Sequence, residues 1–164
     1  MEGKNRNDLV FELYYSYNLE NLYYHLNNRL NKLLITIQLL LSSAVFGDLS
    51  QYFPDLHLNI IIGLILATFS ALSLVYNFGE KAALSQAAKA QYQPLLKRYS
   101  IMTDEELNQA LIVSDSLNAH ITGALTEIAY KRTAIQLGLT DDSKLSCYQS
   151  FIAKFCGESF SNKD

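Results

Sequence analysis

The sequence predicts an all-α protein, built as a two-helix transmembrane hairpin that continues into a cytoplasmic helical bundle. Helix-breaking residues are scarce, because the 164 residues include only 7 Gly and 2 Pro; this argues against a turn-rich β fold and against disorder. All 13 Lys and Arg residues lie outside residues 33–79, so one long stretch carries no basic residue. Charged residues make up 18% of the chain, below the roughly 25% of average soluble proteins.

Residues 1–32 are predicted to form an N-terminal amphipathic cytoplasmic helix. Asn7 or Asp8 could cap a helix over residues 7–31. Leucines spaced three and four residues apart place one apolar stripe on this helix. The stripe consists of Leu19, Leu22, Leu26 and Leu30. No helix breaker separates this segment from the next, so the two helices can be continuous.

Residues 33–79 are predicted to form the transmembrane hairpin. Its second half, residues 56–79, lacks Asp, Glu, Lys and Arg. As a helix it would span about 36 Å, enough for a hydrocarbon core of about 30 Å. The first half, residues 33–47, would span about 22 Å, or about 31 Å if it extends to Phe53. Pro54 marks the break between the halves.

The charge distribution around the hairpin predicts its orientation. Basic residues flank it on both outer sides, so the positive-inside rule places both termini in the cytoplasm. Asp48, Asp55 and His57 then form an external turn. Two other interpretations are a buried hairpin in a soluble helical protein and a cleaved signal peptide. The uncharged length of residues 56–79 argues against the first, and the polar helix before residue 33 argues against the second.

Residues 80–157 are predicted to form a cytoplasmic helical region. Its first part, residues 80–100, extends the second membrane helix and is rich in Ala, which favours helix. Pro94 is expected to kink or end this helix.

A long helix is predicted to follow. Thr103 and Glu106 have the spacing of a capping box at its start, and Gly138 is the expected C-cap, giving about 35 residues and roughly 50 Å. A last amphipathic helix is expected over residues 143–155, with Leu145, Tyr148, Phe151, Ile152 and Phe155 on one face. This helix either packs on the bundle, which we favour, or lies on the membrane surface. Residues 158–164 are expected to be a frayed tail.

Small residues recur in the second membrane segment. Gly63, Ala67 and Ala71 are four residues apart, a spacing that lets membrane helices approach closely. We therefore expect this stripe to pack against another helix, and the protein to be a homo-oligomer.

Polar side chains in the membrane segments are candidates for lining a pore. Gln38 and Ser42 lie one turn apart in the first segment, and Thr68 lies in the second. An amide in hydrocarbon is costly unless it finds a partner or water. Gln38 and Ser42 therefore either bond within the hairpin or between protomers, or face a water-filled path in an oligomer.

The sequence gives no support for catalysis, and we expect no enzyme, no catalytic residues and no cofactor. It contains no Gly-rich phosphate loop and no GxSxG, HExxH or CxxC motif. The three His residues are scattered, so no metal site is expected. The 2 Cys are too few for a disulfide scaffold and are expected to be free thiols. A net charge of -3 does not suggest nucleic-acid binding.

The layout resembles the SLATT domain, two membrane helices that continue into a helical cytoplasmic region. The resemblance covers roughly residues 20–140 and is carried by RLNKLLITIQLLLSSAVFG and NIIIGLILATFSALSLVYNFGEKAALSQAAKAQYQPLL. It implies an effector of the bacterial inner membrane, predicted to form pores or disrupt membranes in bacterial conflict systems such as antiphage defence. The family is commonly linked to nucleotide-signal synthases or sensors, so the resemblance implies a separate cytoplasmic regulatory protein as the trigger. The family has no catalytic residues to carry over.

The function expected from these features is an oligomeric membrane protein that permeabilises the membrane and is controlled through its cytoplasmic helices. One alternative is a non-conducting membrane-anchored adaptor that recruits a cytoplasmic partner. Another is a phage holin or superinfection-exclusion protein. In each case the expected partners include membrane lipid.

Overall fold

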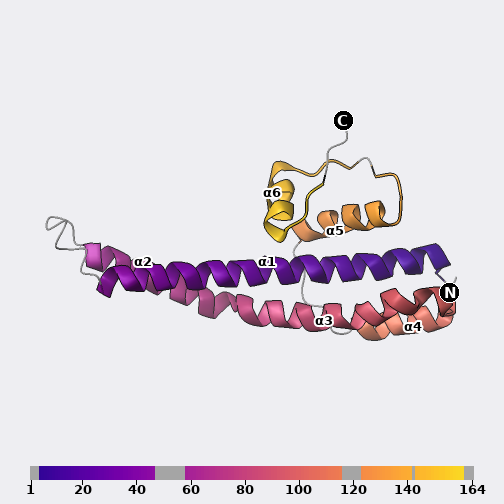
Figure 1. The fold of residues 1–164 in the computed structure, drawn as a ribbon, viewed down its shortest axis with the longest axis horizontal. Helices are drawn as coiled ribbons and strands as arrows, with labels where there is room; N and C mark the ends of the chain where they lie inside the picture. The colour runs from indigo at the N-terminus through magenta and orange to yellow at the C-terminus, as the bar shows by residue number, and fades with distance from the viewer. Residues whose placement is uncertain (1–3, 47–57, 116–122, 142, 161–164) are drawn as a thin grey trace. The chain divides into compact units, whose positions relative to one another are not determined.

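The computed structural model describes residues 4–46, 58–115, 123–141 and 143–160. Every regular element within these ranges is a helix (Figure 1), which confirms the all-α prediction. In chain order the elements are α1 (Arg6–Phe46), α2 (Leu58–Tyr76), α3 (Phe78–Arg98), the short 3-10 helix η2 (Tyr99–Ile101), α4 (Asp104–Asp115), α5 (Gly123–Gln136) and α6 (Cys147–Cys156).

The chain forms two compact units. Met1–Leu26 and Lys81–Asp164 form the first, which we call the bundle unit, and Asn27–Glu80 forms the second, the hairpin unit. Helix α1 belongs to both units, since it passes the boundary at Leu26 without a break. The bundle unit is therefore assembled from both ends of the chain.

Helix α1 is uninterrupted because its 41 residues include neither Gly nor Pro, the residues that most disfavour a helix interior. The helices predicted on either side of residue 32 are thus one continuous helix. The Asn5 carbonyl accepts hydrogen bonds from the backbone N–H groups of Asp8 (3.0 Å) and Leu9 (3.1 Å). The prediction that Asn7 or Asp8 caps the helix is wrong, because both residues lie inside its first turn.

One core of the bundle unit joins α1 to α3 and α4. Its buried members are Leu9, Leu13, Tyr92, Leu107 and Leu111. None of these side chains is more than 1% exposed, and burying a large apolar side chain contributes about 1.5–3 kcal/mol. The Tyr92 hydroxyl donates to Oδ1 of Asp115 at 2.7 Å, so the ring is buried while its polar end is satisfied.

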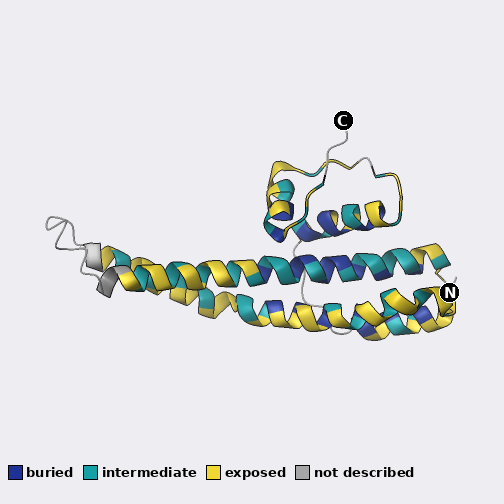
Figure 2. Ribbon diagram, in the orientation of Figure 1, coloured by how far each residue is buried: buried dark blue, intermediate teal, exposed yellow. Residues whose placement is uncertain are grey.

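A second core joins α1 to α5 and α6. Its buried members are Leu19, Leu22, Tyr23, Leu125, Ile128, Ala129, Ile152, Ala153 and Cys156. The predicted leucine stripe supplies Leu19 and Leu22 to this core, and Leu26 packs at its margin. Leu30 lies in the hairpin unit, where it is half-buried. Helix α1 therefore carries both cores of the bundle unit, and Figure 2 shows its buried positions in dark blue.

Polar side chains also fix α1 within the bundle unit. Asn18 is 4% exposed, and its Nδ2 donates to Thr133 Oγ1 at 3.0 Å and to Gln136 Oε1 at 2.7 Å. Lys89 Nζ donates to Asn21 Oδ1 at 3.2 Å. A buried amide without partners would be costly, so the first set of bonds specifies the position of α5 on α1.

Arg6 fastens the start of α1 to the junction of α3 and α4. Its Nη1 donates to the Met102 carbonyl at 3.1 Å and to Asp104 Oδ1 at 3.0 Å. The guanidinium also donates to the Tyr99 carbonyl. Carbonyls at a helix end have no partner within the helix, and one guanidinium has enough N–H groups to satisfy several of them.

The sequence predicts that the second membrane helix continues without a break into residues 80–100, and this prediction is wrong. Helix α2 ends at Tyr76, and Asn77 has φ +47° between α2 and α3. Asn enters this left-handed region more readily than most non-Gly residues, and its side chain donates to the Glu80 carboxylate. Pro94 does not end the following helix, because α3 continues to Arg98.

The predicted capping box at the start of α4 is confirmed. The Thr103 N–H donates to Glu106 Oε2 at 2.9 Å, and the Glu106 N–H donates to Thr103 Oγ1 at 3.3 Å. Gly138, with φ +67°, ends α5 as predicted, and the Leu139 N–H bonds back to the Ala134 carbonyl at 2.8 Å, which is a Schellman motif. The sequence predicts one long helix between Thr103 and Gly138, and the structure describes two helices in this range, α4 and α5. Residues 116–122 lie outside the described part.

Helix α6 begins later than predicted, at Cys147 instead of residue 143. Asp141 accepts hydrogen bonds from the N–H (3.0 Å) and Oγ (2.9 Å) of Ser143. Such local bonds between a side chain and a nearby backbone group compete with helix formation. The helix starts where Ser146 and Gln149 form a capping box.

The buried face of α6 differs from the predicted one. Ile152, Ala153 and Cys156 are buried, whereas Tyr148 and Phe151 are 65% and 66% exposed. Tyr148, Phe151 and Phe155 share one side of α6, but the neighbouring side, through Ile152, Ala153 and Cys156, is the one that meets the second core. Cys147 is exposed and Cys156 is buried, and no disulfide joins them, as predicted. Phe160 packs against the second core, and residues 161–164 lie outside the described part.

Neighbouring residues on α4 provide a test of the first core. Leu111→Ala should lower the free energy of unfolding by about 2–5 kcal/mol, because it empties a buried site. Ile112 is 62% exposed, so Ile112→Ala should change the same quantity by no more than about 0.5 kcal/mol. Both values can be measured by urea unfolding of the full chain in detergent, followed by far-UV circular dichroism. Equal effects of the two substitutions would contradict this packing.

Candidate functional site

The hairpin unit exposes apolar side chains on most of its described surface, as the yellow segments of α2 in Figure 2 show. Leu74 and Val75 are 83% and 77% exposed, and Leu64 is 70% exposed. The other large apolar residues exposed here are Leu33, Ile35, Leu39, Leu40, Ile60, Ile61, Ile65, Leu72 and Tyr76. Soluble monomers rarely expose a continuous apolar patch of more than a few hundred Å². This surface therefore requires an apolar environment or a partner.

Among the described residues, one helical segment is long and apolar enough to cross a membrane, Ile60–Ile101, and its most apolar 18 residues are 0% buried. Helix α2 supplies the apolar part with 19 residues, a length of about 28 Å against a hydrocarbon core of about 30 Å. The apolar end of α1, residues 33–46, has a length of about 21 Å. Length and composition thus indicate membrane association for α2.

Each helix of the hairpin unit covers one stripe of the other, and the two run side by side (Figure 1). In α2, Ile62, Leu66, Phe69 and Ser73 are half-buried at spacings of four, three and four residues, and Gly63 beside Ile62 is half-buried as well. In α1 the half-buried positions include Leu34, Ile37 and Leu41. Spacings of three and four residues are typical of two helices that pack against each other along one line of contact. The remaining positions of both helices face outward.

The small-residue stripe is largely uncovered by the rest of the described chain. Ala67 and Ala71 are exposed, and Gly63 is half-buried. A Cβ atom added at Gly63 would meet no atom within 4 Å. The stripe is thus open for another helix to approach.

The candidate pore-lining residues are divided between two surfaces. Gln38 and Ser42 are half-buried and lie next to the half-buried Ile37 and Leu41 of α1. Thr68, in contrast, is exposed on α2. The Asn31 amide lies 3.4 Å from the Cβ position of Gly79, and counting along the antiparallel pair from this contact puts Ser42 about level with Thr68. The structure therefore brings Gln38 and Ser42 onto one face but not Thr68. The predicted external turn of Asp48, Asp55 and His57 lies outside the described residues.

Threonine hydroxyls of the hairpin unit bond to their own helices. Thr36 Oγ1 donates to the Lys32 carbonyl at 2.8 Å, and Thr68 Oγ1 donates to the Leu64 carbonyl at 2.9 Å. These bonds satisfy each hydroxyl without water. Such internal pairing is what a helix needs in hydrocarbon, where an unsatisfied polar group costs several kcal/mol.

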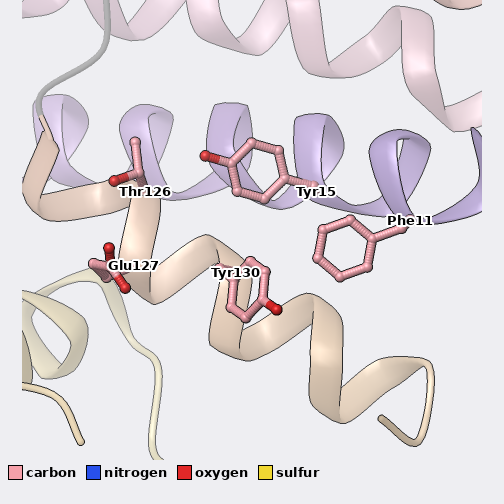
Figure 3. Close-up of a pocket in the computed structure, with 5 residues that line it drawn as sticks. All are labelled: Phe11, Tyr15, Thr126, Glu127 and Tyr130. Atoms are coloured by element: carbon pink, nitrogen blue, oxygen red, sulfur yellow. The ribbon is translucent and has the colours of Figure 1, made fainter. Parts of the chain in front are cut away.

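The bundle unit contains a cavity between α1 and α5, shown in Figure 3. Its volume is about 450 Å³, and it is lined by Phe11, Tyr15, Thr126, Glu127 and Tyr130. The rings of Phe11 and Tyr15 are nearly parallel, with an interplanar angle of 13° and centroids 6.3 Å apart. The ring of Tyr130 is inclined by 56° to that of Phe11, at 5.3 Å. Three aromatic rings and one carboxylate thus surround the same space.

Electrostatics couple the two sides of this cavity. Burial raises the pKa of the Tyr15 phenol above its ordinary value of 10.0, and the negative charge of Glu127 raises this pKa further. Thr126 Oγ1 donates to the Gly123 carbonyl at 2.6 Å, so its hydroxyl oxygen is left as an acceptor. The lining side chains therefore present aromatic faces and oxygen atoms, and none of them carries a positive charge.

Sequence reasoning missed this cavity. The spacing of four between the α1 aromatics, and of three between Glu127 and Tyr130, places each pair on one helical face. Nothing in the spacing shows that the two faces meet. Within the described part of the chain, no group of three His, Cys, Asp or Glu side chains could hold a metal ion.

Comparison with protein-family models, curated proteins and solved structures finds no match to this chain.

The pKa of Tyr15 tests the geometry of the cavity. Glu127→Gln should lower this pKa toward 10.0, because the carboxylate charge no longer disfavours the phenolate. The pKa should stay above 10.0, since burial is the larger cause of its rise. The titration can be followed by NMR of the full chain labelled with ¹³C at the tyrosine ring. Glu158→Gln, which removes an acidic residue outside the cavity lining, is the control and should leave the Tyr15 titration unchanged. A pKa that does not respond to Glu127→Gln would contradict the proximity of the two groups.

Proposed function

We propose that this protein is an integral membrane protein whose hairpin unit enters the bilayer, with the bundle unit in the cytoplasm. We further propose that its copies associate and permeabilise the membrane, as the SLATT resemblance implies. The exposed apolar surface of α2 is the observation that carries this proposal. Transferring one large apolar side chain out of water contributes about 1.5–3 kcal/mol, so the exposed residues of this unit together represent a gain on the order of 10 kcal/mol or more.

The apolar end of α1 is proposed to enter the bilayer beside α2. Its outward side chains Leu33, Ile35, Leu39 and Leu40 are all exposed. Its described apolar part is shorter than the hydrocarbon core. A short helix can be accommodated because the bilayer thins locally, or because the Lys32 side chain extends to place its ammonium group at the membrane surface. No Lys or Arg lies in residues 33–79, which supports a hairpin with both ends in the cytoplasm of a bacterial inner membrane.

Association is proposed to occur through Gly63, Ala67 and Ala71. Small residues let helix backbones approach, and packing drives helix association inside lipid. Open space at Gly63 supports a contact with a helix from another copy. A single two-helix protomer cannot enclose a pore, so Gln38 and Ser42 would line a water path only after association.

Regulation is proposed to pass through α1. This helix carries both cores of the bundle unit and continues into the hairpin unit. A cytoplasmic protein that alters packing of the bundle unit therefore acts on a helix that also enters the proposed membrane segment.

Membrane insertion can be tested with two Leu→Arg substitutions. Leu64→Arg should lower the share of the chain recovered in carbonate-washed bacterial membranes, because Arg at the centre of a membrane helix costs about 2.5–3.5 kcal/mol on insertion scales. Leu84, on α3, is 54% exposed, so Leu84→Arg is the matched control and should leave the membrane fraction unchanged. Recovery of the unsubstituted chain in the soluble fraction would refute membrane insertion.

Permeabilisation can be tested with a voltage-sensitive dye in bacteria after induced expression. The unsubstituted chain should collapse the membrane potential, and Gly63→Leu should preserve it at equal membrane level by blocking close helix approach. Ala83 is exposed on α3, so Ala83→Leu adds similar bulk outside the stripe and should still collapse the potential. If the unsubstituted chain is in the membrane and the potential stays intact, spontaneous permeabilisation is wrong and a membrane-anchored adaptor is favoured.

A further inference from the structure

The cavity between α1 and α5 plays no part in the proposed membrane function. It has a volume of about 450 Å³, which lies within the range of about 300–1,000 Å³ typical of small-ligand sites. All of its lining residues belong to the bundle unit. It can therefore be considered independently of the hairpin unit.

Aromatic faces dominate one side of this cavity. Phe11 and Tyr15 are half-buried on α1 with nearly parallel rings, and Tyr130 inclines toward Phe11 from α5 (Figure 3). The face of an aromatic ring carries negative electrostatic potential, which attracts a cation within about 6 Å of the ring centroid. The centroids of the Phe11 and Tyr130 rings are 5.3 Å apart at an angle of 56°, so these two rings pack against each other and a cation can contact only the ring faces that line the cavity.

The charge in the cavity is negative, and so is the electrostatic potential at the faces of the aromatic rings. Glu127 supplies a carboxylate beside the Tyr15 phenol, and Thr126 and Tyr15 supply neutral oxygen atoms. None of the five lining residues is Lys, Arg or His. A phosphate or carboxylate ligand would therefore meet repulsion with no compensating donor of positive charge.

We propose that this cavity binds an organic cation of the alkylammonium class, with the ammonium group against the ring faces that Tyr15 and Tyr130 turn toward the cavity and its charge balanced by Glu127. Aromatic side chains with a nearby carboxylate suit a weakly hydrated quaternary or alkylated ammonium better than a strongly hydrated metal ion. The volume of the cavity also exceeds what a bare ion requires. A free cation and a cationic lipid head group present the same chemistry to this site.

The test uses the full chain in a maltoside detergent and sodium phosphate buffer, neither of which contains an ammonium group. Choline is titrated by isothermal calorimetry against 3,3-dimethylbutan-1-ol, the uncharged molecule of the same shape. Choline should bind saturably, at one site per chain, and at least about 10-fold more tightly than the alcohol. Equal affinity of the two molecules, or no saturable choline binding, would overturn the proposal.

Two substitutions at exposed positions locate the binding. Tyr130 is 46% exposed, so Tyr130→Leu should leave the fold intact and weaken choline binding about 2- to 30-fold by removing one ring face. Glu127→Gln should weaken binding about 2- to 5-fold, as expected for loss of an exposed charge partner. Tyr148, on α6, is 65% exposed and does not line the cavity, so Tyr148→Leu is the matched control. Unchanged affinity in both cavity variants, with unchanged thermal unfolding, would overturn the assignment to this cavity.

The source of the cation is distinguished in nanodiscs. Free choline is titrated into the chain in discs of phosphatidylglycerol alone and in discs that also contain phosphatidylcholine. A weaker apparent affinity in the second kind of disc supports capture of lipid head groups by the same cavity, and equal affinity supports a free cation. This binding can be measured whether or not the protein permeabilises a membrane, so its result does not depend on the proposed function.

Discussion

The continuity of α1 is the constraint on which the described structure depends. Arg6–Phe46 forms one helix because no Gly or Pro interrupts it, and successive parts of that helix serve different surroundings. Its first part is covered on two sides, by Tyr92 and its neighbours and by Ile128 and its neighbours. Its last part exposes Leu39 and Leu40. A single break in α1 would separate the element that organises the bundle unit from the element that contributes to the hairpin unit.

Side-chain hydrogen bonds have two different effects in the described structure. In the bundle unit, Asn18 reaches from α1 to Thr133 and Gln136 on another helix, and such bonds specify which helices are neighbours. In the hairpin unit, the Thr68 hydroxyl bonds to a carbonyl of its own helix. Such a bond satisfies the hydroxyl without specifying a neighbouring helix. It also occurs in the bundle unit, where Thr133 Oγ1 donates to the Ala129 carbonyl at 2.8 Å.

Local chemistry could be predicted from the sequence, and contacts between distant segments could not. The capping box at Thr103 and the left-handed Gly138 depend on residues within one turn, so their patterns were sufficient. The break at Asn77 was missed because Asn tolerates a positive φ without requiring it. The cavity was missed because it needs Tyr15 and Tyr130 to meet across 115 residues of chain, and helical spacing does not report which faces meet. Gly63, Ala67 and Gln38 could be placed on faces, but their roles depend on neighbours that a single chain does not supply.

The bundle unit is discontinuous in sequence, and this determines the order in which the protein can assemble during synthesis. Arg6 bonds to the carbonyls of Tyr99 and Met102, and Asn18 bonds to Thr133. None of these bonds can form until the ribosome has released the whole of residues 27–80. The apolar segment therefore emerges while the first helix still lacks its partners in the bundle. For a chain whose apolar segment enters the bilayer, as proposed above, insertion can therefore begin before the bundle unit has closed.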